Sequence, residues 1–157
     1  MALPLLFRNH FQLGYSVRNI DKAIGTLSEK FGLSKWQIVR PPEEAPSSAL
    51  AWAYVKDLMI ELVEPRPGRM PYYDAWLPES ESGARLHHMA YMVEDEDEWR
   101  SVKQAFGDQG IAMVVDEQMG PILSYRYFDT RPELGHYTEF VLLGPKGKKF
   151  WADVPQN

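Results

Sequence analysis

The two halves of the 157-residue chain carry polar residues at matched positions: Gln12, Glu61, His88 and Glu139. The glutamine and the histidine are 76 positions apart, and the two glutamates are 78 positions apart. Two carboxylates, an imidazole and an amide oxygen suit a six-coordinate divalent ion with two positions left for water or substrate. Two carboxylates in a partly buried site are costly unless a cation compensates them. The pattern therefore predicts one divalent metal ion, with zinc, nickel, cobalt, manganese and iron as candidates.

Each of these residues alone is more often a surface residue than a ligand, so the flanking sequence matters. Glu61 lies in the apolar run 59–63, and Glu139 precedes the apolar run 140–143, which favours buried strand positions over surface positions. Two further histidines lie close to the set. Strand alternation turns His87 away from His88, whereas His10 shares the face of Gln12 and is the alternative ligand there.

The matched spacing reflects a repeated order of expected elements. Each half begins with an extended run, continues with polar residues typical of a helix start and apolar residues at helical spacing, and ends with three strand-like segments. The first half comprises strands at 11–17, 36–39, 49–55 and 58–63, and a helix whose apolar face is Ile20, Ala23, Ile24, Leu27 and Phe31. The second comprises strands at 87–93, 112–115, 123–128 and 137–143, and a helix with Trp99, Val102 and Phe106 that stops near Gly107 or Gly110.

This order predicts an α+β fold built from two βαβββ modules, since one such module cannot bury its own apolar face. We expect a single domain over residues 1–157. Module one spans about 8–64, a linker about 65–83, module two about 84–143, and a C-terminal tail 144–157. Lys56-Asp57 is the expected hairpin turn, although it lacks the favoured glycine. The aromatic linker and the tail, through Phe150 and Trp151, are expected to pack rather than remain free.

The composition excludes several classes of protein and site. No cysteine is present, so disulfide scaffolds, thiolate zinc sites and cysteine nucleophiles are ruled out. The formal net charge of −5 gives no general attraction for nucleic acid. No apolar stretch approaches the roughly 20 residues of a membrane span. The opening MALPLLFRNH lacks the basic region and cleavage site of a signal peptide, so we expect a cytoplasmic protein that binds neither membrane nor nucleic acid.

Four segments, at 12–17, 59–65, 86–93 and 135–140, resemble the metal-binding strands of a known family. The family is the glyoxalase / methylmalonyl-CoA epimerase branch of the vicinal-oxygen-chelate superfamily, which has the glyoxalase/bleomycin resistance fold. The resemblance covers about residues 8–145. It implies a cleft around one divalent metal and carries the family's ligands over to Gln12, Glu61, His88 and Glu139. Gln12 stands where many members have histidine. By analogy we also expect a homodimer.

The resemblance implies a metal-dependent isomerase, epimerase or lyase that removes a proton next to a metal-chelated carbonyl of a small-molecule substrate. Glu139 is the expected general base and Glu61 its counterpart on the opposite side. Aromatic residues on the strands favour a bulky or aromatic substrate, although sheet packing is the alternative role of such residues. The expected substrate-binding residues are Trp52, Tyr54, Tyr125, Tyr127 and Tyr137.

Three other interpretations remain at this point. A ring-cleaving dioxygenase of the same superfamily would use two histidines and one carboxylate on iron, whereas only one histidine occupies a ligand position here. A non-catalytic, resistance-type binding protein on the same fold generally lacks the metal ligands. A dimeric interaction module would leave Glu61 and Glu139 buried without a counter-charge.

Overall fold

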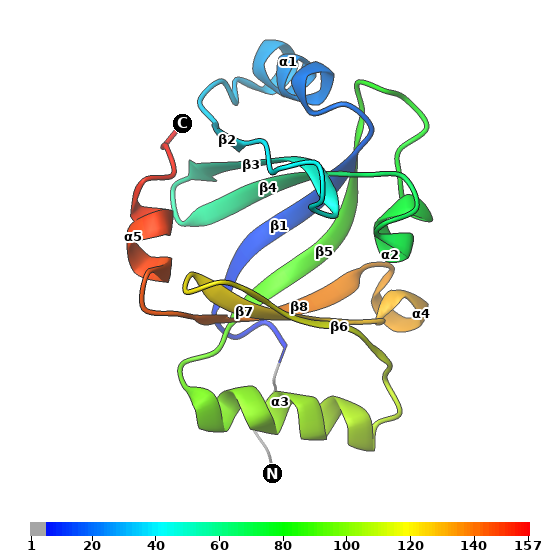
Figure 1. Cartoon of the computed structure of the whole chain (residues 1–157), viewed down its shortest axis with the longest axis vertical. Coiled ribbons are helices and arrows are strands. Elements are labelled where there is room, and N and C mark those ends of the chain that lie inside the picture. The colour runs from blue at the N-terminus through cyan, green and yellow to red at the C-terminus, as the bar shows by residue number, and fades with distance from the viewer. Residues whose placement is uncertain (1–5) are drawn as a thin grey trace. The chain divides into compact units, whose positions relative to one another are not determined.

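The computed structural model describes residues 6–157 and shows the predicted α+β fold, with the order β-α-β-β-β occurring twice (Figure 1). The first set is β1 (His10–Val17), α1 (Ile20–Phe31), β2 (Gln37–Val39), β3 (Ser47–Val55) and β4 (Leu58–Pro65). The second set is β5 (Ala84–Met92), α3 (Glu96–Asp108), β6 (Met113–Met119), β7 (Leu123–Phe128) and β8 (Tyr137–Leu143). Short helices are α2 (Pro71–Asp74), α4 (Arg131–Leu134) and α5 (Gly147–Ala152). Residues 1–5, on which part of the signal-peptide interpretation depends, lie outside the described residues.

The chain divides into two compact units that share strands β1 and β5. We call them the α1 unit, Leu13–His87 with Asp153–Asn157, and the α3 unit, whose described residues are 6–12 and 88–152. The unit boundaries fall within strands, so the units differ from the modules expected at 8–64 and 84–143. The single-domain organisation stays a prediction.

In the α1 unit, α1 covers one face of the strands, which are hydrogen-bonded in the order β2-β3-β4-β1. Asn19 caps the helix by accepting a hydrogen bond from the backbone N–H of Lys22, and the Glu64 carboxylate accepts one from the backbone N–H of Ile20 at 2.8 Å. Gly32 ends the helix at φ 77°, a left-handed conformation that glycine adopts without strain. The buried residues between helix and strands are Val17, Ile20, Ala23, Ala49, Ala51 and Leu62.

The predicted hairpin turn connects β3 to β4. Lys56 adopts φ 54° there, a conformation that is unusual for a residue other than glycine. Part of the tail, residues 153–157, continues along β3: the Tyr54 N–H donates to the Pro155 carbonyl at 2.8 Å. The side chain of Asn157 accepts hydrogen bonds from the backbone N–H groups of Ser34 and Lys35 at 2.9 and 2.8 Å.

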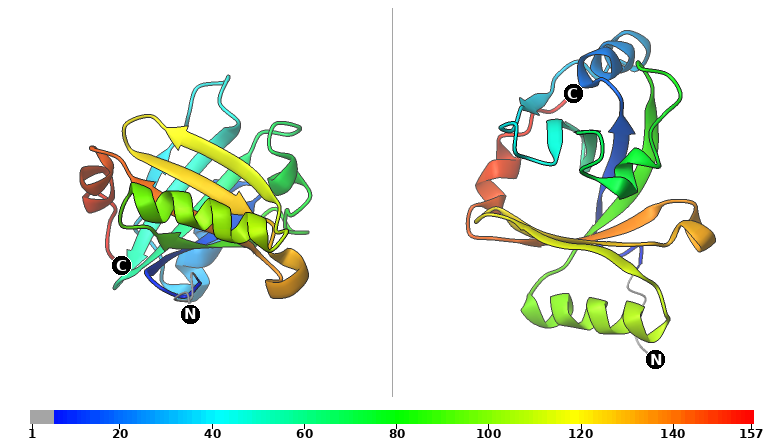
Figure 2. Two further views of the ribbon diagram at one scale, coloured as in Figure 1. Left: turned by 90° about the horizontal axis from the view of Figure 1, so that it is seen from below. Right: turned by 45° about the vertical axis from the view of Figure 1, so that its right-hand side comes forward.

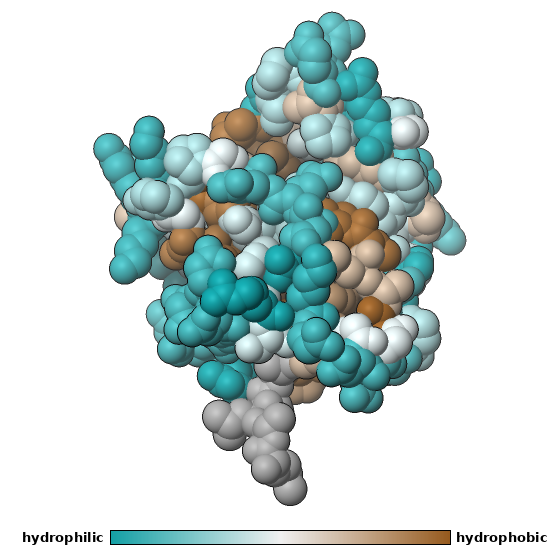
Figure 3. Space-filling model, turned by 60° about the horizontal axis from the view of Figure 1, so that its bottom comes forward, coloured by the Kyte–Doolittle hydropathy of each residue, from teal (hydrophilic) through white to brown (hydrophobic). Residues whose placement is uncertain are grey.

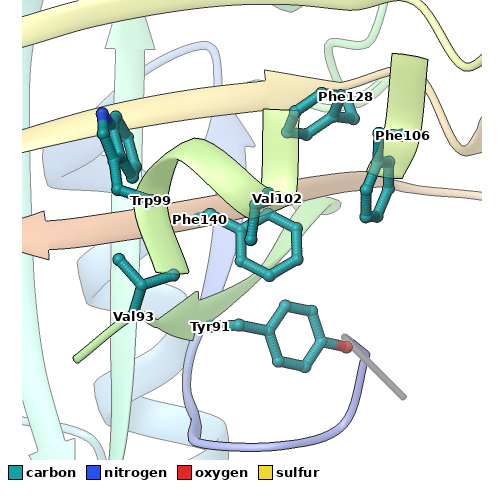
Figure 4. Packing of buried hydrophobic residues seen from close by; sticks show 7 residues of the cluster. All are labelled: Tyr91, Val93, Trp99, Val102, Phe106, Phe128 and Phe140. Carbon is teal, nitrogen blue, oxygen red and sulfur yellow. The ribbon is translucent and has the colours of Figure 1, made fainter. Parts of the chain in front are cut away.

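In the α3 unit the strands follow the order β1-β5-β8-β7-β6, and α3 lies along one face of β6, β7 and β8 (Figure 2). Strands β5 and β8 are parallel, whereas β8 pairs antiparallel with β7 and β7 with β6. Asp95 caps α3 by accepting a hydrogen bond from the Glu98 N–H. Seven buried side chains fill the space between helix and strands (Figure 4): Tyr91, Val93, Trp99, Val102, Phe106, Phe128 and Phe140.

The linker and the tail both pack, as expected. In the linker, the buried Tyr73 ring stacks on His87 with centroids 3.7 Å apart and planes inclined by 4°. In the tail, the Trp151 ring lies 4.9 Å from that of Phe11. Gly144 approaches the β6–β7 turn so closely that a Cβ atom would lie 2.4 Å from the Pro121 carbonyl oxygen. Only glycine fits there.

Figure 3 turns the α3 side of Figure 1 toward the viewer. The surface seen in this view is predominantly hydrophilic, with scattered apolar patches. Exposed charged residues of α3, including Asp97 and Arg100, fit this pattern. Within residues 6–157, no helix is both long and apolar enough to cross a membrane.

The α3 cluster makes a first prediction about stability. Phe140→Ala removes a side chain that is 2% exposed and should lower the free energy of unfolding by about 3–5 kcal/mol, because it leaves a cavity. Phe31 was expected on the apolar face of α1, but this was wrong, because its side chain is 67% exposed. Phe31→Ala is therefore the matched control and should change stability by less than about 0.5 kcal/mol. Urea unfolding of both variants measures the difference. Equal losses would show that the cluster is not the core of its unit.

Candidate functional site

The face of the α3 unit that points away from α3 carries several predicted site residues. Side chains alternate along a strand, so Phe140 points toward α3 and Glu139 points to the opposite face. Residues that pair in register share a face. Glu139 pairs with Tyr127 on β7, and His88 on β5 pairs with Tyr137 on β8. The strand register therefore gathers an imidazole, a carboxylate and two phenols on one face.

His88 and Glu139 are in direct contact on this face. The distance between His88 Nε2 and Glu139 Oε2 is 3.2 Å, and the two side chains are 0% and 7% exposed. The Tyr127 ring lies 5.0 Å from the imidazole. Adjacent ligands of an octahedral ion with bonds of about 2.1 Å stand about 3.0 Å apart. The separation of these two donor atoms therefore fits two neighbouring ligands of one divalent ion.

Gln12 belongs to the same unit and is buried, whereas His10 has other surroundings. The His10 ring lies 5.4 Å from Tyr91, a member of the α3 cluster, and its Nε2 is 3.1 Å from the backbone oxygen of Gln12. His10 is the first residue of β1 and follows Asn9 at φ 49°, so the extended geometry begins only here. This placement favours Gln12 as the candidate ligand.

Glu61 belongs to the α1 unit, on the face of its strands opposite α1. Its Oε1 accepts a hydrogen bond of 2.8 Å from the indole N–H of Trp52, its register partner on β3. Trp52 is buried, so its position orients the carboxylate. Within residues 6–157, no three side chains of histidine, cysteine, aspartate or glutamate form a group that could hold a metal ion. The four-residue ligand set, with Glu61 as a member, stays a prediction.

The predicted substrate-binding aromatics have diverse surroundings. Tyr125 donates a hydrogen bond of 2.9 Å to Glu117 and lies 5.8 Å, ring to ring, from Tyr127. Tyr137 is buried, and burial raises its pKa above the ordinary value. Burial also raises the pKa of Tyr54, in the α1 unit. Strand register places Tyr125, Tyr127 and Tyr137 on the face of Glu139, so these three are suited to a role beside it.

One contact near this face, between Arg131 and Tyr137, was not predicted from the sequence. The Arg131 guanidinium carbon lies 4.5 Å from the centre of the Tyr137 ring, and the Asp129 carboxylate holds the same guanidinium with two hydrogen bonds of 2.7 Å. The sequence signal for this contact is the segment 131–135, where a proline near the start and a glycine at the end indicate a short helix. In the structure proline follows the first helical residue, and Gly135, at φ 77°, ends the helix. This short helix turns Arg131 back onto Tyr137.

The ion pair leads to a pH prediction. The hydrogen bonds from Arg131 lower the pKa of Asp129 below its ordinary value of 3.8. A lowered folded-state pKa stabilises the protein above the unfolded-state value, and this contribution disappears as the pH falls through the folded-state pKa. Asp129→Asn should lower the free energy of unfolding by up to about 1 kcal/mol at pH 7 and leave it unchanged in strong acid. Urea unfolding against pH measures this, with Asp57→Asn in the exposed β3–β4 turn as control. A cost independent of pH would exclude the ion pair as its source.

The comparisons with known proteins agree with this architecture. The family model described as the Glyoxalase/Bleomycin resistance protein/Dioxygenase superfamily matches residues 11–121, well over half of the chain. A search of curated proteins gives no match.

Several solved structures are similar in fold. A variant of Streptomyces coelicolor methylmalonyl-CoA epimerase, in complex with 2-nitronate-propionyl-CoA, has 16% identity and a TM-score of 0.63, covering 88% of this chain and 96% of its own. Methylmalonyl-CoA epimerase from Mycobacterium tuberculosis has 17% identity and a TM-score of 0.60, with 93% and 97% covered. A hypothetical protein from Bacillus halodurans has 16% identity and a TM-score of 0.58, with 85% and 92% covered. At such identities the likeness shows the fold.

Proposed function

Because the chain belongs to the glyoxalase/bleomycin resistance protein/dioxygenase superfamily, we propose that it is a metal-dependent isomerase, epimerase or lyase that removes a proton next to a metal-chelated carbonyl. The observation that carries the proposal is the buried contact of 3.2 Å between His88 Nε2 and Glu139 Oε2. A carboxylate and an imidazole at this distance are suited to holding a divalent ion together. The same carboxylate is suited to accepting a proton.

The proposed ligands are Gln12, Glu61, His88 and Glu139. Nitrogen and oxygen donors of this kind suit zinc, nickel, cobalt, manganese or iron. When bound, a divalent ion supplies Lewis acidity toward the substrate carbonyl, which lowers the cost of removing the adjacent proton.

The side chains of the chain perform the proton transfer itself. We assign Glu139 as the base, because its carboxylate is nearly buried and lies on the face shared with Tyr127 and Tyr137. Glu61 is the counterpart, and the Trp52 N–H fixes the orientation of its carboxylate. The rings Trp52, Tyr54, Tyr125, Tyr127 and Tyr137 are proposed to line the substrate site.

The surroundings of the four histidines disfavour dioxygenase chemistry, which needs two histidines and one carboxylate. His88 contacts Glu139. His87 stacks on Tyr73, and its Nε2 is 3.1 Å from the Tyr72 carbonyl oxygen. His10 packs beside the α3 cluster, and His136 Nδ1 is 2.8 Å from the Tyr137 carbonyl oxygen.

Metal content tests the proposed site directly. Elemental analysis of purified protein, after incubation with nickel, cobalt, manganese, zinc and ferrous iron, should find about one divalent ion per chain. His88→Ala should lose this ion because it removes the imidazole ligand. His10→Ala, the control, should keep it. Wild-type protein that takes up none of these metals would refute the metal-dependent mechanism, and loss in His10→Ala would make His10 a ligand.

Proton exchange tests the assignment of the base. Methylmalonyl-CoA is the first substrate to examine, because the similar structures named above include methylmalonyl-CoA epimerases. In deuterated water, mass spectrometry should detect exchange at the carbon between its carbonyl groups. Glu139→Gln should slow this exchange at least about a hundredfold, because the amide cannot accept the proton.

Glu133→Gln, on the exposed surface of α4, is the control and should exchange at the wild-type rate. Unchanged exchange in a Glu139→Gln protein that retains its metal would exclude Glu139 as the base. A complete absence of exchange in the wild type would exclude methylmalonyl-CoA as substrate.

A further inference from the structure

A row of three side chains crosses the α1 unit on the face that points away from α1. Gln37 on β2 pairs in register with Trp52 on β3, and Trp52 pairs with Glu61 on β4. The neighbouring register pair, Ile38 with Ala51, lies on the other face, where Ala51 packs in the α1 cluster. Gln37 therefore shares its face with the proposed counterpart carboxylate and is not part of the core beneath α1.

The amide oxygen of Gln37 is buried and accepts no hydrogen bond from residues 6–157. The register neighbour of Gln37 in the row is Trp52, whose indole N–H donates to the Glu61 carboxylate at 2.8 Å. The indole has only one N–H, so it satisfies the carboxylate and not the amide.

A buried carbonyl oxygen without a donor destabilises a fold, and natural proteins leave few such atoms. A methionine of similar length would fill the same space without a polar atom. The fold therefore gains nothing from the Gln37 oxygen, and its presence points to a donor outside the chain.

We propose that Gln37 is a specificity-determining residue that accepts a hydrogen bond from an N–H or O–H group of the substrate. The inference rests on the proposed function, in which Glu61 faces the reacting part of the substrate. Adjacent strands lie about 4.8 Å apart, so the backbones of Gln37 and Glu61 are separated by roughly 10 Å. Gln37 thus recognises a part of the substrate remote from the reacting carbon. An acyl thioester with amide groups along its carrier arm meets this requirement.

The test combines a binding measurement with a stability measurement on Gln37→Met. Calorimetric titration with methylmalonyl-CoA should show binding about tenfold weaker than wild type, because the substrate donor loses its acceptor. Urea unfolding of the same variant should show a midpoint equal to or above that of wild type, because the unpaired oxygen is gone. Gln37→Glu retains an acceptor and should bind more tightly than Gln37→Met. Gln118→Met, at an exposed position of β6, should change neither quantity.

Two results would overturn the proposal: binding by Gln37→Met as tight as wild type, or a lowered urea midpoint, which would show that the amide serves the fold. Failure of the proposed substrate is a separate result. If wild-type protein does not bind methylmalonyl-CoA, that substrate is excluded. The urea midpoints of Gln37→Met and wild type still test whether the Gln37 amide stabilises the fold. A midpoint at or above wild type then supports a partner outside the chain, and a lowered midpoint refutes it.

Discussion

The parallel pairing of β5 with β8 is the constraint on which the α3 unit depends. Parallel neighbours cannot be joined by a tight turn and need a long crossover connection. Here α3, β6 and β7 form that connection, and they also cover one face and extend the sheet. The pairing brings His88 and Glu139 into contact across 51 residues of sequence. One register thus determines both the core against α3 and the polar contact on the opposite face.

The sequence predicts the elements of this fold well because apolar periodicity reflects which face is buried. The prediction of strand bounds fails where the strand residues are exposed. Strand β6 was expected at 112–115 but runs to Met119, because the polar residues 116–118 lie on an exposed edge strand and show no apolar alternation. The division into α1 and α3 units was also not foreseen, since it depends on long-range pairing of β1 and β5.

The candidate site was predicted in part. Repeat spacing identified His88 and Glu139, and their contact follows from strand alternation once the register is known. Repeat spacing could not show that the Trp52 N–H donates a hydrogen bond to Glu61, because a hydrogen bond between side chains depends on rotamers as well as register. The same holds for Arg131 on Tyr137 and for the unpaired oxygen of Gln37. Nor does sequence alone decide between His10 and Gln12, because strand alternation predicts the same face for both.

The shared strands have a consequence for synthesis of the protein. Each compact unit is built from two separated stretches of chain, residues 6–12 joining 88–152 and 13–87 joining 153–157. The beginning of β1 therefore cannot pair until β5 has been synthesised. The hydrogen bonds of Tyr54 on β3 cannot form until Pro155 and Asn157 have been synthesised. Neither unit can be completed while the chain is still being translated through residue 152. Contacts so distant in sequence form slowly, so we expect the nascent chain to remain incompletely folded until late in elongation.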